Sequence, residues 1–134
     1  MSKLSKLAPD NFDLETTTVW SFPERGKWAT HQSSFRGNWA PQIPRNLILR
    51  YSNSNDLVLD QMCGCGTTLI ECKLTGRDAI GIDINPMMVE MSKKNLIFDS
   101  PAKVNIEVKV GDARNLKDIK DNSVDLIGVN AFLS

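Results

Sequence analysis

One segment of this 134-residue chain constrains its fold more than any other. Residues 57–68 read LVLDQMCGCGTT, and residues 80–86 read IGIDINP. This order predicts a buried strand, a glycine-rich turn, a helix and a second strand that ends in a carboxylate. Gly64 and Gly66 lack a Cβ, so the backbone of the turn can approach a ligand closely. Asp83, at the end of the second strand, is placed to bind a ribose diol, which is typical of a site for a nucleoside-containing cofactor.

The turn differs from both common phosphate-binding patterns. A dinucleotide fingerprint has a third glycine in the order G-x-G-x-x-G, whereas Gly66 is followed by Thr-Thr-Leu. A G-x-x-x-x-G-K-[ST] loop is also missing from the sequence. Asp60, just before the turn, would repel a phosphate and favours a cationic ligand such as S-adenosylmethionine. An ordinary βαβ turn without a ligand is the alternative, but carboxylates recur at the ends of successive predicted strands.

These residues resemble a known family. Residues 60–68 are similar to the D-P-F-x-G-S-G-T-T motif of DNA methyltransferases that modify exocyclic amino groups, the N4-cytosine and N6-adenine enzymes. Gln61, Met62 and Cys65 replace the proline, phenylalanine and serine of that motif. The resemblance extends over residues 18–130, and residues 39–48 are similar to the helix that lies along the methionine end of the cofactor. The flanking segments, which carry the choice of DNA as substrate, are less distinctive than the glycine loop.

The resemblance implies S-adenosylmethionine as the cofactor. Asp60 and the turn would hold its methionine end, Asp83 its ribose and Asp112 its adenine amino group. The full set of expected cofactor-binding residues is Asp60, Cys63, Gly64, Gly66, Thr67, Thr68, Asp83, Ile84, Asp112 and Ala113. Cys65 is interpreted as a small residue in the place of the family's serine, because His31 is the only histidine and a metal ligand set is incomplete.

The family's catalytic motif, [DNS]-P-P-[YFW], follows the fourth strand. Its polar side chain and a backbone carbonyl accept protons from the amine, and its aromatic residue stacks on the flipped base. Residues 130–134 read NAFLS, so Asn130 occupies the polar position while both prolines and the aromatic residue are replaced. We therefore expect this chain alone to be catalytically inert. It would be half of a split enzyme, a truncated remnant or a protein repurposed for binding, and the abrupt loss of similarity after Ile127 favours truncation.

Alternating elements predict an α/β fold with a Rossmann-like, doubly wound parallel sheet that stops after the fourth strand. Helices are expected over residues 44–51, 67–74 and 86–97, and strands over residues 57–61, 78–84, 104–110 and 124–129. Residues 43–134 would then form an incomplete cofactor-binding domain. The outer edge of the fourth strand would be apolar and unpaired, which favours self-association or a completing subunit.

Residues 1–42 are expected to form an irregular, basic and aromatic N-terminal arm. The chain has no net charge, but residues 21–50 hold five cations and one acidic residue, interleaved with tryptophan and phenylalanine. Such a surface can bind the phosphates and unstacked bases of a nucleic acid, with Arg36 and Arg45 as candidate phosphate contacts. Alternatively, the aromatic residues pack the arm onto the sheet and the arginines cap its exposed face. A non-catalytic nucleic-acid-binding or partner protein is thus the rival function, and RNA is an alternative substrate to DNA.

Two further observations bear on the compartment. The sequence contains no span suited to crossing a membrane and no secretory signal at its N-terminus. The cysteines, Cys63, Cys65 and Cys72, are odd in number and clustered. A reducing cytoplasm is the simplest expectation.

Overall fold

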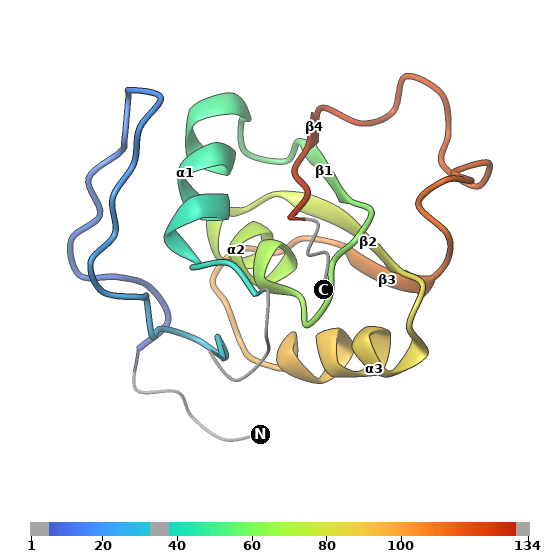
Figure 1. Ribbon diagram of the computed structural model, residues 1–134, viewed down its shortest axis with the longest axis horizontal. Helices are drawn as coiled ribbons and strands as arrows, with labels where there is room; N and C mark the ends of the chain where they lie inside the picture. The colour runs from blue at the N-terminus through green and yellow to red at the C-terminus, as the bar shows by residue number, and fades with distance from the viewer. Residues whose placement is uncertain (1–5, 33–37, 131–134) are drawn as a thin grey trace.

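The computed structural model describes residues 6–32 and 38–130. Its elements are α1 (Gln42–Tyr51), β1 (Leu57–Asp60), α2 (Thr67–Thr75), β2 (Asp78–Asp83), α3 (Pro86–Asn95), β3 (Ile106–Val110) and β4 (Leu126–Ile127). The strands are parallel and form one sheet in the order β3-β2-β1-β4 (Figure 1). This confirms the predicted Rossmann-like α/β fold. The strand order reverses between β1 and β4, and such folds bind ligands at the carboxyl ends of the strands beside that point.

Cap residues explain where α2 ends and where α3 begins. Gly76 follows α2 in the left-handed conformation, with φ of 81°, and its N–H bonds to the carbonyl of Cys72. The side chain of Asn85 accepts a hydrogen bond from the N–H of Met87 at 3.0 Å, and Pro86 is the first residue of α3. Both caps are those predicted from the sequence, because each depends on a single local residue type.

Each element differs from its predicted range by one or two residues at one end, and β4 differs at both ends. α1 begins at Gln42 rather than Pro44, because a proline is tolerated throughout the first turn, where N–H groups have no intrahelical partner. β4 covers two residues rather than 124–129. Its pairing with β1 nevertheless continues on either side, since the N–H groups of Asp125 and Gly128 bond to carbonyls of β1 at 2.9 and 3.0 Å.

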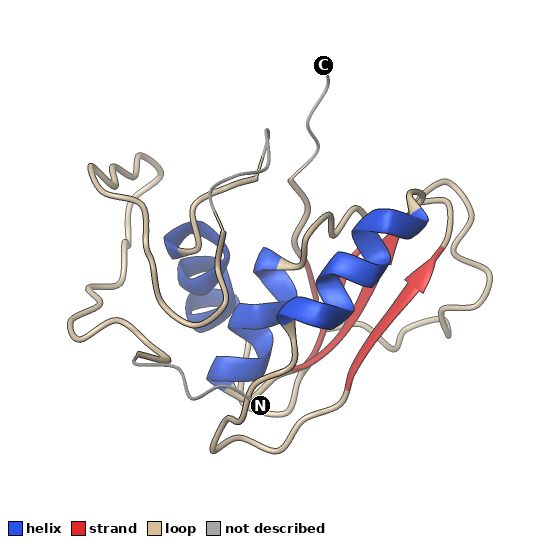
Figure 2. Cartoon of the chain, turned by 90° about the horizontal axis from the view of Figure 1, so that it is seen from below, coloured by secondary structure: helices blue, strands red, loops and turns tan. Residues whose placement is uncertain are grey.

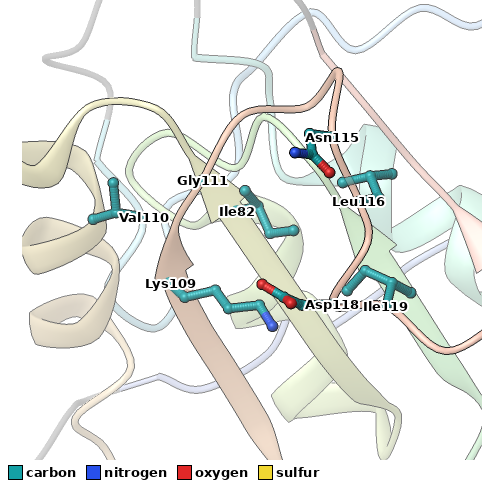
Figure 3. A pocket seen from close by; sticks show the side chains of 8 residues that line it. All are labelled: Ile82, Lys109, Val110, Gly111, Asn115, Leu116, Asp118 and Ile119. Carbon is teal, nitrogen blue, oxygen red and sulfur yellow. The ribbon is translucent and has the colours of Figure 1, made fainter.

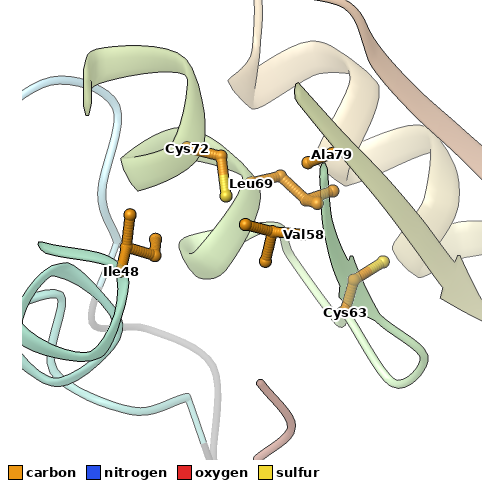
Figure 4. Packing of buried hydrophobic residues seen from close by; sticks show 6 residues of the cluster. All are labelled: Ile48, Val58, Cys63, Leu69, Cys72 and Ala79. Carbon is orange, nitrogen blue, oxygen red and sulfur yellow. The ribbon is translucent and has the colours of Figure 1, made fainter. Parts of the chain in front are cut away.

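The hydrophobic core lies between the helices and one face of the sheet. Figure 2 shows the three helices on the same side of the strands. The buried cluster between them consists of Ile48, Val58, Cys63, Leu69, Cys72 and Ala79 (Figure 4). Gly81 of β2 is required by this packing, because a Cβ at that position would collide with the side chain of Leu69. The close approach of α2 to β2 fixes the glycine turn between β1 and α2 over the sheet.

The opposite sheet face is covered in part by the loop that follows β3. Leu116 and Ile119 of this loop line a small pocket together with Ile82, which is buried (Figure 3). Ile127 of β4 lies on the same face and is 59% exposed. Within the described residues, no strand pairs with the outer edge of β4. Self-association through this edge remains a prediction.

Residues 6–32 and 38–40 contain no helix or strand, and side-chain hydrogen bonds attach them to α1. Asn46 is fully buried and bonds to both the N–H and the carbonyl of Glu15, at 2.7 and 3.1 Å. Gln42 accepts from the N–H of Gly26 at 2.9 Å and donates to the carbonyl of Glu24 at 2.7 Å. These described residues are therefore irregular and firmly attached to the helical layer. The separation of the arm from residues 43–134 as a distinct unit stays a prediction.

Candidate functional site

The carboxylates predicted from the sequence lie at the carboxyl ends of neighbouring strands. Asp60 ends β1, Asp83 ends β2, and Asp112 follows the last residue of β3 by two positions. Because the strands are parallel, these ends meet at one edge of the sheet. Asn130 follows β4 at the same edge. The fold therefore brings together the carboxylates and the polar position predicted for catalysis.

The glycine turn adopts backbone conformations that glycine tolerates best. Gly64 has φ of 54° and Gly66 has φ of 94°. The N–H of Gly64 donates to Oδ2 of Asp83 at 2.9 Å, and the N–H of Asn85 donates to Oδ1 at 2.9 Å. One carboxylate thus fixes the turn and the end of β2 together. Because a carboxylate offers about four acceptor positions, Asp83 keeps capacity for the hydroxyl groups of a ligand.

Asp60 is a carboxylate held in a dry environment, with 2% of its surface exposed. Burial raises the pKa of Asp60 to about 6, and the negative charge of Asp83 adds to this shift. The N–H of Met62, which donates to Asp60 at 3.1 Å, opposes it. The hydroxyl of Thr68 also lowers the pKa by its proximity, although it lies outside good hydrogen-bond geometry. Among the described residues no cation pairs with Asp60, and a buried carboxylate of this kind is suited to a positively charged ligand.

Asp112 is held by a neighbouring arginine. Nε and Nη2 of Arg114 donate to its two oxygens at 3.0 and 2.7 Å, and the backbone N–H of Arg114 donates to Oδ1 at 2.9 Å. These hydrogen bonds lower the pKa of Asp112 to about 2. The side chain of Arg114 is 87% exposed, so the pair lies at the surface. Asp112 is therefore ionised and able to accept a further hydrogen bond from an amino group.

The remaining predicted residues surround the same edge. Ile84, directly after Asp83, is 68% exposed and presents an apolar side chain beside the strand end. Ala113 is half-buried, next to Asp112. Thr67 and Thr68 begin α2 and are buried. The hydroxyl of Thr67 donates to the side-chain oxygen of Asn38, which places the residues preceding α1 against the turn.

The three cysteines are buried residues of the fold. Cys63, Cys65 and Cys72 are free and buried. Burial raises the pKa of Cys63 to about 12 and raises that of Cys65 as well, so both thiols stay neutral. No cluster of His, Cys, Asp and Glu in the described part of the chain has the arrangement of a metal site. In the same ranges, no helix has the length and apolar character needed to cross a membrane.

The two arginines proposed for phosphate contacts have different outcomes. Arg36 lies outside the described residues. Arg45 lies on α1 with its guanidinium turned inward, where Nη1 donates to Oε1 of Glu71 at 2.8 Å. Its side chain is 14% exposed, and its Cζ lies 5.9 Å from the centre of the Trp28 ring. This placement gives Arg45 a structural role in place of the expected phosphate contact.

Sequence reasoning missed the buried carboxylate that organises the arm. Glu71 of α2 is fully buried, and its Oε2 accepts from Nε1 of Trp28 at 2.7 Å and contacts Nε2 of His31 at 2.6 Å. Together with Arg45, three residues from the arm and α1 converge on this one side chain. The available signal was an acidic residue between the apolar Ile70 and Cys72.

The assembled edge fits a cationic nucleoside without phosphates. Asp60 supplies negative charge in a buried position, and Asp83 supplies acceptor oxygens next to the glycine turn. Ile84 offers an exposed apolar surface to a flat ring, and Asp112 an ionised acceptor for an amino group. The buried carboxylate of Asp60, next to the turn, would oppose a pyrophosphate. The arrangement therefore agrees with S-adenosylmethionine and disagrees with a dinucleotide.

Sequence comparison places this arrangement among methyltransferases. Residues 1–94 match the N6/N4 methyltransferase family, described as DNA methylase, and residues 58–134 match a methyltransferase domain. The type II methyltransferase M.MjaII of Methanocaldococcus jannaschii is 36% identical over 63 residues, which is 47% of this chain and 12% of that protein. M.HpaI of Haemophilus parainfluenzae is 48% identical over 50 residues, or 37% of this chain and 16% of the relative.

A further relative is a tRNA (guanine(10)-N2)-dimethyltransferase of Methanothermobacter thermautotrophicus. It is 35% identical over 94 residues, which is 69% of this chain and 27% of that protein. The chain thus spans less than a third of the length of each of these three relatives.

Solved structures share the fold. An S-adenosylmethionine-dependent methyltransferase of Methanosarcina mazei has a TM-score of 0.53 and 28% identity, over 60% of this chain and 39% of its own. One from Methanococcus maripaludis has a TM-score of 0.54 and 26% identity, over 66% of this chain and 40% of its own. An RNA methyltransferase of Salinibacter ruber in complex with S-adenosyl-L-homocysteine is alike in fold alone, with a TM-score of 0.51 and 21% identity, over 66% and 56%. With the match over residues 1–94, the chain belongs to the N6/N4 DNA methylase family of S-adenosylmethionine-dependent methyltransferases.

Proposed function

We propose that this chain carries the S-adenosylmethionine site of a methyltransferase that acts on an exocyclic amino group of adenine or cytosine in DNA. The observation that supports this most is the family match over residues 1–94, which includes the arm as well as the glycine turn. The two type II methyltransferases are further relatives that support a methyltransferase. The choice of base and the recognition sequence lie beyond these residues.

Each site residue has a distinct role in this proposal. The cofactor supplies an electrophilic methyl group when it is bound. Asp60 stabilises positive charge at the methionine end, because its carboxylate is buried beside the turn. Asp83 and Asp112 orient the ribose and the adenine through their free acceptor positions. Asn130, at the end of β4, is the candidate acceptor for a proton of the substrate amine, although the prolines and the aromatic residue of the family motif do not follow it.

RNA is the second candidate substrate, and a specific observation favours it. The tRNA (guanine(10)-N2)-dimethyltransferase matches 69% of this chain, a larger share than either of the two type II enzymes. The target in the name of that enzyme, N2 of guanine, is also an exocyclic amino group. The chemistry proposed for this edge is therefore the same in both cases, and the polymer that presents the base distinguishes them.

Binding of labelled nucleic acid tests the proposal and its rivals. We expect a DNA pool of random sequence to bind more tightly when S-adenosylhomocysteine is present, and to bind better than RNA of the same sequences. The increase should disappear in Asp83→Ala, which removes the acceptor next to the turn. Preference for RNA would favour the second candidate. Salt-dependent DNA binding that is indifferent to the cofactor would instead support a non-catalytic nucleic-acid-binding protein.

A further inference from the structure

Two buried side chains of α3 bond to consecutive carbonyls of the glycine turn. The hydroxyl of Ser92 donates to the carbonyl of Gly64 at 2.6 Å, and the side-chain amide of Asn95 donates to the carbonyl of Cys65 at 2.9 Å. Ser92 is 0% and Asn95 is 4% exposed. Both donors lie one helical turn apart, on the face of α3 that packs against the turn.

The same helix limits the position of the turn by direct contact. A Cβ on Gly66 would lie 3.0 Å from Oγ and 3.2 Å from Cβ of Ser92, so the turn and α3 are already in close packing. Gly64 and Gly66 both have positive φ. A glycine that is not held by other contacts readily adopts many other backbone conformations. The hydrogen bonds to α3 therefore select one conformation of a segment with high intrinsic freedom.

The peptide groups of Gly64 are held on both sides. Its N–H bonds to Asp83 at 2.9 Å, while its carbonyl bonds to Ser92. The orientation of the Asn95 amide is likewise fixed, because its oxygen accepts from the side chain of Gln32 at 3.4 Å, which leaves the NH₂ group for Cys65. The turn and the carboxylate of Asp83 thus form one unit with α3 before a ligand arrives.

We propose that Ser92 and Asn95 are positioning residues that hold the glycine turn in its cofactor-binding conformation. This inference rests on the cofactor site of the proposed function, and it adds the residues that set the affinity of that site. If the turn were released from α3, the cofactor itself would have to order it on binding. The free-energy cost of this ordering would weaken the binding of the cofactor. The loss of affinity should therefore exceed what a general loss of stability produces.

A matched pair of serines separates the two effects. Ser52, like Ser92, is buried and donates to a backbone carbonyl at 2.6 Å, but its partner is Ile48 in α1, away from the turn, and its Oγ also accepts from Nε of Arg77 at 2.9 Å. We expect Ser92→Ala to weaken the binding of S-adenosylmethionine about tenfold, the loss of one hydrogen bond to a buried carbonyl. Ser52→Ala should lower the denaturation midpoint at least as much as Ser92→Ala, because it also leaves Nε of Arg77 without its acceptor, and it should change the affinity less than about twofold. Ser92→Cys, which keeps the size and a weak donor, should lie between Ser92→Ala and the wild type.

Hydrogen exchange of the ligand-free protein gives a second readout. The amides of Gly64 and Gly66, which bond to Asp83 and to the carbonyl of Cys63 at 2.9 Å, should exchange faster in Ser92→Ala than in the wild type and stay protected in Ser52→Ala. Equal affinities for Ser92→Ala and Ser52→Ala would overturn the positioning role and leave the cofactor site intact. A folded wild-type chain that does not bind the cofactor would overturn the site itself, and the inference with it.

Discussion

Replacing Glu71 with alanine should lower the free energy of unfolding by about 3–5 kcal/mol, the range found when one partner of a buried ion pair is removed. Glu71 is fully buried, and its two oxygens accept from Arg45, Trp28 and His31 at 2.8, 2.7 and 2.6 Å. The substitution leaves a largely buried guanidinium without its carboxylate, and it leaves two ring N–H groups without an acceptor. Equilibrium denaturation with urea measures this loss directly.

Two control variants separate the network from the general effect of a substitution in a helix. Glu71→Gln keeps the volume and one acceptor oxygen, so it should lose less stability than alanine. Glu90→Ala removes an exposed carboxylate from α3, where the partner Lys93 lies 3.7 Å away, and should change stability by less than about 0.5 kcal/mol. Because Trp28 and His31 belong to the arm, limited proteolysis of Glu71→Ala should cleave near these residues first. A loss below about 1 kcal/mol in Glu71→Ala would contradict the role assigned to this carboxylate.

Asp60→Asn is expected to stabilise the protein at neutral pH and to weaken cofactor binding. Burial raises the pKa of Asp60 from its ordinary value of 3.8 to about 6, so the ionised carboxylate is unfavourable in the folded state. Each pKa unit corresponds to about 1.4 kcal/mol, which makes the gain on removing the charge about 2–3 kcal/mol at most. The asparagine keeps an oxygen for the N–H of Met62. Loss of the negative charge should weaken binding of the cationic cofactor more than tenfold, by about 1.4 kcal/mol or more.

The raised pKa of Asp60 predicts how stability and cofactor affinity change with pH. Between about pH 4 and pH 6, the folded protein holds the proton of Asp60 while the unfolded chain has released it, so this group makes stability fall as pH rises. The fall should be absent in Asp60→Asn. Cofactor affinity should rise with pH through about 6, because the cation prefers the ionised carboxylate. Denaturation and calorimetry at several pH values measure both trends. Affinity that falls over this interval would contradict the assignment of Asp60 to the methionine end.

The sequence was most informative where a structural feature depends on a few neighbouring residues. The glycine turn, the cap at Gly76, the N-cap at Asn85 and the carboxylates at the strand ends each follow from a short local pattern. Their convergence required only the rule that parallel strands share one edge for their carboxyl ends. This is why the fold and the cofactor can be predicted from the sequence.

The remaining features depend on contacts between distant residues. Glu71 meets Trp28, His31 and Arg45, which lie 43, 40 and 26 residues away in the chain. No local pattern indicates such a pairing, and Arg45 was therefore predicted to contact a phosphate. The contacts of Ser92 with Gly64 span 28 residues in the same way. The packing of the helices determines the contacts of both Glu71 and Ser92. The hydrophobic periodicity of a single segment does not reveal how the helices pack.

The central claim is that the glycine turn and the carboxylate of Asp83 bind S-adenosylmethionine, and calorimetric titration tests it most directly. Asp78→Ala is the matched control for Asp83→Ala, because Asp78 lies at the other end of β2 and also accepts a backbone N–H, from Asn105 at 2.9 Å. We predict saturable binding of S-adenosylmethionine and S-adenosylhomocysteine by the wild type and by Asp78→Ala, and its loss in Asp83→Ala. A folded wild-type chain that binds neither ligand, or an Asp83→Ala variant that binds as well as the wild type, would contradict the account.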